Sequence, residues 1–480
     1  MTKEDKNARS SKRKGYPFLI VFGAVALVFG LSFVPWSELT GGFMKDFNLL
    51  SDLFPGSVKV TAEEQLDPEL EAALVEEDST EQVIAEGPSL GINITTTTDG
   101  TETISLHQVA EPKEPVDNRA PDGTVIFEDY TVDSSGLKNL KRAMTQASYR
   151  PVRIAVIGDS YIEGDIFTMN VREMLQDRFG GAGVGYVPAS SELVSFRTSV
   201  TQKCNGWTKH EIRKNTRDGM KTLPGEYFTA SGTASASYKG TKALSHLDSW
   251  NRTSVMAVAP QGGSVTLTID GATETLELPE EDLVRTLTID GATTSASLSA
   301  TNGVEILGVF LNNSDGICVD NMSLRGNSGQ THRKLSVERA EQMRKDIDYD
   351  LIVVEYGINA LSSQQSDYSG YKKLMMQTIS RLRECYPNAD ILMMGIGDRG
   401  QKVGSDVKSV PTSANMVTAQ RDAARQTGVL FWDTREAMGG PDAVLKWRAD
   451  GYINPDYIHL NAKGGNALAK LFVDALLRAL

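Results

Sequence analysis

The sequence is poor in the residues on which disulfide and metal chemistry depend. Only three cysteines and five histidines occur among 480 residues. Three cysteines are too few for a disulfide framework, and an odd number leaves at least one thiol unpaired. No cysteine or histidine cluster has the spacing of a metal site, and neither a glycine-rich phosphate loop nor a dinucleotide fingerprint is found. The sequence therefore predicts no metal and no cofactor.

Basic charge is also scarce. The 49 lysines and arginines are outnumbered by 62 acidic residues, which gives a net charge of −13. This balance argues against nucleic acid as a partner, because nucleic acid attracts a positive protein surface. A chain of this length is expected to contain more than one domain.

Two short motifs about 300 residues apart supply the parts of a nucleophilic hydrolase. Residues 153–157 are a mostly apolar run that predicts a buried parallel strand, and Gly-Asp-Ser follows at 158–160. Ser160 would then lie at the carboxyl end of a strand, where open α/β sheets place their sites. Gly-Asp-Ser alone is common in ordinary turns, so this motif needs a partner.

The second motif, Asp-Tyr-Ile-His at residues 456–459, provides that partner. A histidine that accepts the serine proton must be held in one tautomer by an acceptor on its other nitrogen. Asp456 can hold His459 in this way from the same loop. Ser160, Asp456 and His459 are therefore the candidate catalytic residues, and the alternative is that both motifs are ordinary loops.

Candidate oxyanion donors lie between these motifs. A second apolar run, residues 350–356, is followed by Gly-Ile-Asn-Ala, and the amide of Asn359 at this strand end can donate to a developing oxyanion. A simple turn asparagine is the alternative. Upstream, residues 324–331 contain Gly326 and Gly329, and a glycine there would let its backbone N–H approach a substrate closely.

Together, these blocks resemble the SGNH or GDSL-type hydrolases. Ser160 matches the nucleophile of the first block, Gly329 the glycine of the second and Asn359 the asparagine of the third. Asp456 and His459 match the Asp-x-x-His of the last block. The resemblance implies a flavodoxin-like three-layer α/β/α fold, with ester hydrolysis or acyl transfer as its activity.

The same resemblance implies an oxyanion hole made by Ser160, Gly329 and Asn359, with Gly326 as the alternative glycine. One position departs from the family pattern, because Ala360 stands where an aspartate usually follows the asparagine. The oxyanion donor itself is retained, so the departure bears on the geometry of the loop.

The N-terminus carries a basic flank and then an apolar stretch that ends near Trp36. About 20 such residues are enough to span a bilayer. No small-residue cleavage site follows, which favours an uncleaved signal anchor over a cleaved signal peptide. Because the basic flank stays in the cytoplasm, we expect a single-pass protein of the inner (cytoplasmic) membrane whose catalytic domain is exported to the periplasm or cell exterior.

Composition and pattern divide the chain into six segments. These are a basic cytoplasmic tail (1–15), a transmembrane signal anchor (16–36), an acidic low-complexity stalk (37–125), a first part of the hydrolase domain (126–199), an inserted β-sandwich (200–322) and a second part of the hydrolase domain (323–480). In the hydrolase domain we expect further strands at 390–395 and 429–433 and helices at 167–179, 368–386 and 461–480.

The insert is predicted from alternating polar and apolar residues. Thr-Ile-Asp-Gly-Ala-Thr occurs at 268–273 and again at 288–293, and Asp-Gly between alternating runs is a hairpin signal. With this insert the chain looks most like the peptidoglycan O-acetylesterases, in which the insert resembles a carbohydrate-binding module. Its aromatic residues are either sugar platforms or core residues: Trp207, Tyr227, Tyr238 and Trp250.

Three functions are compatible with these observations. The first is a membrane-anchored serine esterase that removes O-acetyl groups from peptidoglycan or another acetylated envelope polysaccharide. The second is an O-acetyltransferase with the same Ser-His-Asp site, for which a membrane acyltransferase is a possible partner. The third is a non-catalytic glycan-binding envelope protein.

Overall fold

The computed structural model describes residues 90–96, 102–108, 118–214 and 216–480. The predicted cytoplasmic tail and signal anchor lie outside these residues, as does most of the predicted stalk. Within the stalk, β1 (Leu90–Thr96) pairs antiparallel with β2 (Glu102–Gln108). None of the helices in the described ranges has both the length and the apolar character needed to span a bilayer.

The hydrolase domain is built on a six-stranded mixed sheet with the order β14-β4-β15-β16-β19-β3. The first five strands run parallel, and β3 at the edge pairs antiparallel with β19. The four strands expected in this domain are present as β4, β15, β16 and β19. The bounds are β14 (Gly316–Ser323), β4 (Pro151–Gly158), β15 (Leu351–Glu355), β16 (Asp390–Met394), β19 (Leu430–Trp432) and β3 (Glu128–Asp129). A separate hairpin of β17 (Gly400–Val403) and β18 (Asp406–Ser409) follows β16.

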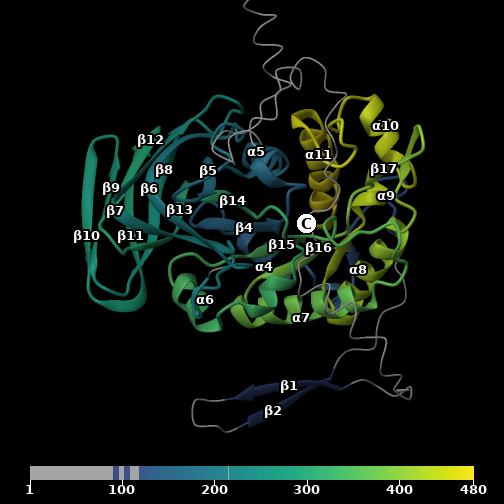
Figure 1. The fold of residues 1–480 in the computed structure, drawn as a ribbon, viewed down its shortest axis with the longest axis horizontal. Helices are drawn as coiled ribbons and strands as arrows, with labels where there is room; N and C mark the ends of the chain where they lie inside the picture. The colour runs from purple at the N-terminus through teal and green to yellow at the C-terminus, as the bar shows by residue number, and fades with distance from the viewer. Residues whose placement is uncertain (1–89, 97–101, 109–117, 215) are drawn as a thin grey trace, which may run out of the picture. The chain divides into compact units, whose positions relative to one another are not determined.

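Both faces of this sheet are buried under helices. Along β4, Ile154 and Val156 pack into one core, whereas Ala155 and Ile157 pack into the other, because successive side chains of a strand point to opposite faces. Helices α5 and α11 cover the first face, and α6, α7 and α8 cover the second (Figure 1). Burial on both faces explains why these strands read as continuous apolar runs.

The three helices expected from the sequence are α5, α7 and α11, and the other helices were not anticipated. The C-terminal helix shows why the pattern succeeded: Leu468, Phe472 and Leu476 recur on one face and are at most 2% exposed, and burying each contributes about 1.5–3 kcal/mol. The bounds are α4 (Lys138–Met144), α5 (Thr168–Phe179), α6 (Val337–Arg344), α7 (Ser369–Cys385), α8 (Ser413–Thr427), α9 (Thr434–Met438), α10 (Ala443–Ala449) and α11 (Ala462–Ala479).

The insert is a nine-stranded antiparallel sheet whose main path is β10-β9-β12-β7-β13-β8-β11, with β5 on β13 and β6 on β7. The two ends of this path, β10 and β11, approach each other, so the sheet curls into a near-barrel around its own apolar core. The strands are β5 (Gly183–Val187), β6 (Val200–Glu211), β7 (Glu226–Gly240), β8 (Trp250–Ala259), β9 (Gly263–Ile269), β10 (Ala272–Leu278), β11 (Glu281–Thr293), β12 (Ser295–Ala300) and β13 (Glu305–Asn312).

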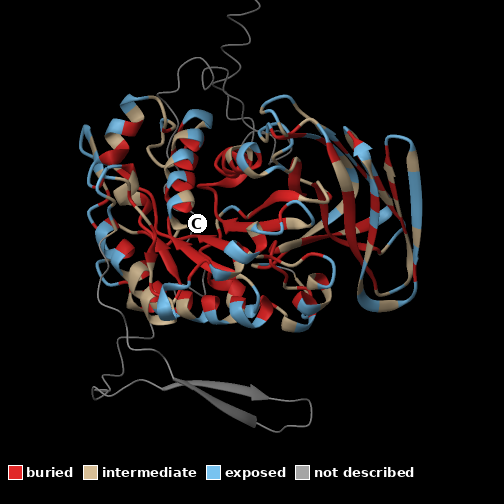
Figure 2. Cartoon of the chain, turned by 180° about the vertical axis from the view of Figure 1, so that it is seen from behind, coloured by how far each residue is buried: buried red, intermediate tan, exposed pale blue. Residues whose placement is uncertain are grey.

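The expectation of a β-sandwich is therefore wrong in detail, because one continuous sheet encloses the core in place of two facing sheets. The strands of the central sheet are buried along almost their whole length, and the outer edge of the insert is exposed (Figure 2). We call the curled sheet, from β5 to β13, the β module.

The predicted boundaries of the insert, 200–322, also need correction. Strand β5 lies before residue 200, yet it pairs with β13 of the β module. All of strand β14 except its last residue lies inside the predicted insert, yet the strand pairs parallel with β4 along its whole length. The β module therefore spans about residues 183–312, and β14 returns the chain to the catalytic sheet.

The hydrolase domain begins earlier than residue 126. Val125 is buried, and its carbonyl oxygen accepts a hydrogen bond from Nε1 of Trp432 at 3.1 Å. Arg119 forms a β-bridge with Val125. The last residues of the predicted stalk, from 118 onward, thus belong to the folded domain.

Candidate active site

The turn after β4 presents Ser160 at the carboxyl end of the sheet. Gly158 is required there, because a Cβ at this position would lie 2.6 Å from Ile162 Cδ1 and 2.8 Å from the carbonyl oxygen of Glu355. The fully buried Asp159 then fixes the turn, since its Oδ1 accepts the N–H of Tyr161 at 2.8 Å. Ser160 itself is 9% exposed, so only a small part of it faces solvent.

Before α11, a tight loop holds the histidine. Oδ1 of Asp456 accepts the backbone N–H groups of Ile458 (2.9 Å) and His459 (3.1 Å), and Oδ2 lies 2.8 Å from Nδ1 of His459. Between them, Tyr457 has a φ of 59°, a left-handed conformation that is strained for a tyrosine. One carboxylate therefore sets both the shape of the loop and the orientation of the imidazole.

The structure brings the serine and the histidine together. Nε2 of His459 lies 3.0 Å from Oγ of Ser160, although 299 positions separate the two residues. The Asp456 carboxylate can only accept, so Nδ1 of His459 donates to it and Nε2 is left to accept the serine hydroxyl proton. This tautomer is the one that a serine nucleophile requires.

The charge on Asp456 is maintained by its partners. Burial raises the pKa of this carboxyl, but the hydrogen bonds from the His459 ring and from the backbone N–H groups of Ile458 and His459 outweigh burial and lower the pKa below its usual value. The carboxylate is thus ionised at neutral pH and can stabilise a positively charged imidazole.

Two of the three predicted oxyanion donors, Gly329 and Asn359, lie around the loop that follows β14. Nδ2 of Asn359 donates to Oδ2 of Asp159 at 3.2 Å and to the carbonyl oxygen of Asn327 at 3.1 Å. The N–H of Gly329 donates to Oδ1 of Asn327 at 3.0 Å. Asn359 is therefore linked to the nucleophile turn. The amide of Asn359 and the N–H of Gly329 both already donate to acceptors inside the protein. Their role toward an oxyanion stays a prediction.

A glycine is needed at position 329 for a steric reason. Gly329 has a φ of +87°, and a Cβ there would lie 2.5 Å from the ring of Tyr356. The alternative glycine, Gly326, lies at the other end of the same loop, where its carbonyl oxygen accepts Nη1 of Arg213 from the β module side at 2.6 Å. The loop thus packs closely against Tyr356 at one end and accepts a hydrogen bond from Arg213 at the other.

Sequence reasoning missed Glu355 as a residue of the site. It ends β15, is 1% exposed, and its Oε2 accepts the N–H of Asp159 at 3.4 Å. Burial raises the pKa of Glu355 to about 7. A glutamate that closes an otherwise apolar strand, just before the Gly-x-Asn block, is the signal that could have identified it.

The aromatic residues considered as sugar platforms fall into two groups. Tyr227, Tyr238 and Trp250 are at most 2% exposed and belong to apolar cores, so for these three the platform prediction is wrong and the core alternative holds. Trp207 is half-buried and lines a cavity of about 660 Å³ between the hydrolase domain and the β module. Of the four, only Trp207 is placed where a ligand could reach it.

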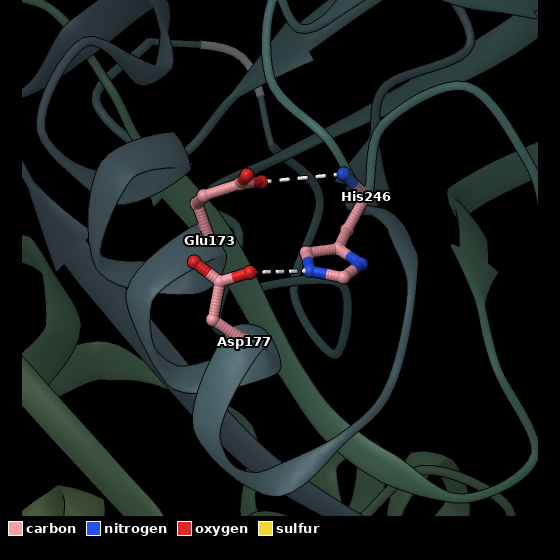
Figure 3. A group of neighbouring side chains, drawn as sticks. All are labelled: Glu173, Asp177 and His246. Atoms are coloured by element: carbon pink, nitrogen blue, oxygen red, sulfur yellow. Dashed lines mark hydrogen bonds and ion pairs between the residues drawn. The ribbon is translucent and has the colours of Figure 1, made fainter.

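One group of metal-capable side chains is found among the described residues. Glu173 and Asp177 on α5 and His246 in the β7–β8 loop have ligand atoms within 4.8 Å of one another (Figure 3). These groups already bond one another or the nearby backbone: Nε2 of His246 lies 2.8 Å from Asp177, and Glu173 accepts the N–H groups of Ser245 (2.8 Å) and His246 (3.3 Å). The contacts tie the β module to α5.

Part of the chain matches a known protein family, and one solved structure is similar over most of its length. Residues 295–467 match the GDSL-like Lipase/Acylhydrolase family. A solved structure described as a peptidoglycan O-acetylesterase in action is similar at 25% identity and a TM-score of 0.61, over 73% of this chain and 98% of that one. No curated protein matches the sequence.

Two further solved structures share much less. A family two carbohydrate esterase from Cellvibrio japonicus is 11% identical with a TM-score of 0.26, over 61% of this chain and 97% of that one. A salicylyl-acyltransferase from a tetracycline biosynthetic pathway is 14% identical with a TM-score of 0.26, over 58% of this chain and 97% of that one. Similarity at this level carries no argument about function.

Proposed function

We propose that this chain is an esterase of the GDSL/SGNH hydrolase family that removes O-acetyl groups from peptidoglycan or a closely related cell-envelope glycan. The observation that carries the proposal is the 3.0 Å contact between Ser160 and His459, with Asp456 on the far side of the ring. The substrate is inferred from the similar peptidoglycan O-acetylesterase, because the match covers 73% of this chain and 98% of that one.

In the proposed reaction, Oγ of Ser160 attacks the acetyl carbonyl carbon and its proton passes to Nε2 of His459. The carbonyl oxygen becomes an oxyanion, and Asp456 stabilises the positive imidazolium. When this intermediate collapses, the bond to the sugar oxygen breaks and His459 gives its proton to that oxygen. Water then attacks the acetyl-enzyme with His459 as base, which releases acetate and restores Ser160.

The oxyanion is proposed to bind the N–H of Ser160, the N–H of Gly329 and the amide of Asn359. Asn359 has the strongest support for this role, because its side chain lies against the nucleophile turn; one of its two present hydrogen bonds, to Asp159 or to Asn327, is then exchanged for one to the oxyanion. Donors of this kind act on charge that develops in the transition state, so they should affect turnover more than substrate binding.

We also propose that residues 16–36 anchor the enzyme in the cytoplasmic membrane and that the acidic segment 37–117 serves as a spacer. The basic flank before the apolar stretch supports an orientation with the catalytic domain outside the cytoplasm. An envelope glycan is found on that side of the membrane, so this topology suits the proposed substrate.

The experiment is a comparison of hydrolysis with transfer. The purified full-length protein is incubated with O-acetylated peptidoglycan, and free acetate is measured against acetyl groups that appear on an added deacetylated glycan. An esterase releases acetate at a rate that the acceptor glycan does not change. Transfer to the acceptor in preference to acetate release would replace the proposal with an O-acetyltransferase, and absence of both reactions would refute the substrate.

A further inference from the structure

A cavity of about 660 Å³ lies between the hydrolase domain and the β module, beside the candidate active site. Its wall on the hydrolase side consists of η4 (Glu163–Asp165), which begins three residues after Ser160, and of the chain that ends β14, residues 321–325. Because β14 is the direct neighbour of β4, and neighbouring strands are about 4.8 Å apart, this wall begins one strand away from the nucleophile turn. Ser160 itself does not line the cavity.

The wall on the side of the β module carries a fixed aromatic ring. Trp207 of β6 packs partly against the core of the β module, and it also lines the cavity. Its indole Nε1 donates to the carbonyl oxygen of Ser235 at 2.8 Å, which holds the ring in place. A ring held in this way can receive the apolar face of a sugar without losing much freedom.

The charged groups of the cavity are balanced. As many basic as acidic side chains line it, and several are paired with one another across short distances. Lys209 lies 3.0 Å from Glu226, and Arg325 lies 2.6 Å from Glu163, which is buried. A paired set of this kind presents many hydrogen-bond donors and acceptors but no strong net field, so it favours an uncharged ligand rich in hydroxyl and amide groups.

From these observations we propose that the cavity is a saccharide subsite, which holds the glycan unit next to the acetylated sugar while Ser160 attacks the ester. The inference rests on the proposed function for its ligand, and it adds where and how the glycan is held. The β module then contributes binding from within the substrate cleft, through Trp207 and the Lys209–Glu226 pair, and the enzyme should prefer an oligosaccharide ester to a small one.

The kinetic test compares substrates of different length. Wild type, Trp207→Ala and Lys209→Met are assayed on O-acetylated peptidoglycan fragments and on p-nitrophenyl acetate, with Tyr149→Ala as the control. Tyr149 is an aromatic residue that is 86% exposed and lies before the start of β4, at the opposite end of this strand from Ser160. The ratio of kcat/KM for the fragment to kcat/KM for the small ester should fall about tenfold in both cavity variants and stay unchanged in the control.

A second arm measures binding without catalysis. The Ser160→Ala protein is titrated with an N-acetylglucosamine tetramer in a calorimeter, alone and combined with Trp207→Ala or Lys209→Met. The subsite predicts binding that both cavity variants weaken. Lys209→Met keeps the test valid if loss of Trp207 disturbs the β module, and the thermal unfolding midpoint reports on this.

The two arms separate the subsite from the proposed function. If wild type releases no acetate from any glycan, the proposed function fails, and the binding arm still decides the subsite. If acetate is released but the selectivity ratio and the tetramer affinity are the same in wild type and both cavity variants, the subsite is refuted and the esterase stands. A tetramer that does not bind at all also refutes the subsite.

Discussion

The buried carboxyl group of Glu355 accepts a hydrogen bond from the backbone N–H of Asp159, 3.4 Å away, at the turn that carries the nucleophile. Both residues are at most 1% exposed. Burial raises the pKa of Glu355 from 4.5 to about 7, so this group changes its charge close to neutral pH. The support of the nucleophile turn is therefore sensitive to pH.

Replacement of Glu355 by glutamine should remove a pH dependence of stability. Between pH values of about 4.5 and 7 the folded protein holds a proton that the unfolded chain has already released. The contribution of this proton to the free energy of unfolding is fully present below about pH 4.5 and is lost as the pH rises through about 7. Glutamine keeps the shape and has no charge to bury, so the free energy of unfolding of Glu355→Gln, relative to wild type, should rise by about 1–3 kcal/mol across this range.

This difference is measured by urea denaturation of both proteins at two pH values, about 4.5 and about 8. The comparison with wild type at each pH cancels the other carboxyl groups, which titrate in both proteins. A difference in unfolding free energy that is the same at the two pH values would show that Glu355 does not carry a raised pKa.

Asp456→Asn should reduce turnover by selecting the wrong tautomer of His459. An amide at this position can donate to Nδ1, which moves the ring proton to Nε2 and removes the acceptor for the serine hydroxyl. We expect kcat for p-nitrophenyl acetate to fall by roughly two to four orders of magnitude. Asp450→Asn, at an exposed aspartate directly after α10, is the matched control and should behave as wild type. Equal activity of both variants would exclude Asp456 from the triad.

Asn359→Ala should lower kcat by about 10²–10³ and change KM little, because its amide is proposed to bind charge that forms only in the transition state. Steady-state kinetics on p-nitrophenyl acetate separate these two constants. The exposed Asn415 on α8 offers a control in Asn415→Ala, which should not change either constant. An effect confined to KM would mean that Asn359 binds the substrate without stabilising the oxyanion.

Exported topology can be tested on intact cells. Protease added to the outside of spheroplasts should release an active fragment and leave a small anchor in the membrane, since the basic flank and apolar stretch predict a signal anchor. Full protection of the protein would place the catalytic domain in the cytoplasm. A mature protein that starts after Trp36 would show that the segment is cleaved.

The strands of the catalytic sheet could be predicted from the sequence because they are buried on both faces. Residues 351–355 and 390–394 are each apolar except for one acidic residue at an end. Short apolar runs of this kind, bounded by turn residues, are typical of strands that are buried on both faces. The contact of Ser160 with His459 followed from two local motifs and their resemblance to one family. Glu355 was missed because its burial depends on how β15 lies beside β4, which no local pattern states.

The repeated Thr-Ile-Asp-Gly-Ala-Thr shows that a short sequence does not determine its own secondary structure. In the first copy Asp270 and Gly271 form the turn between β9 and β10, as predicted. The second copy continues as a strand within β11, where Asp290 pairs with Arg252 of β8 at 2.6 Å. The same hexapeptide thus adopts two structures, and a cross-strand partner distant in sequence decides between them.

The boundaries of the β module could not be predicted from the sequence for a related reason. Strands β13 and β14 are both buried along almost their whole length, so the sequence does not tell which sheet each strand joins. Pairing with β8 in one case and with β4 in the other is a property of the assembled fold. The partial exposure of Trp207 and the burial of Trp250 likewise depend on which face of the curled sheet each residue occupies.

The most direct test of the account is the Ser160→Ala variant of the full-length protein. Acetate released from O-acetylated peptidoglycan is measured for wild type and variant, with circular dichroism to establish that both are folded. Loss of the nucleophile should reduce the rate by about 10⁴–10⁶ and leave only the residual catalysis that substrate binding and the oxyanion donors supply. A folded Ser160→Ala protein that releases acetate at a rate close to wild type would contradict the assignment of Ser160 as the nucleophile.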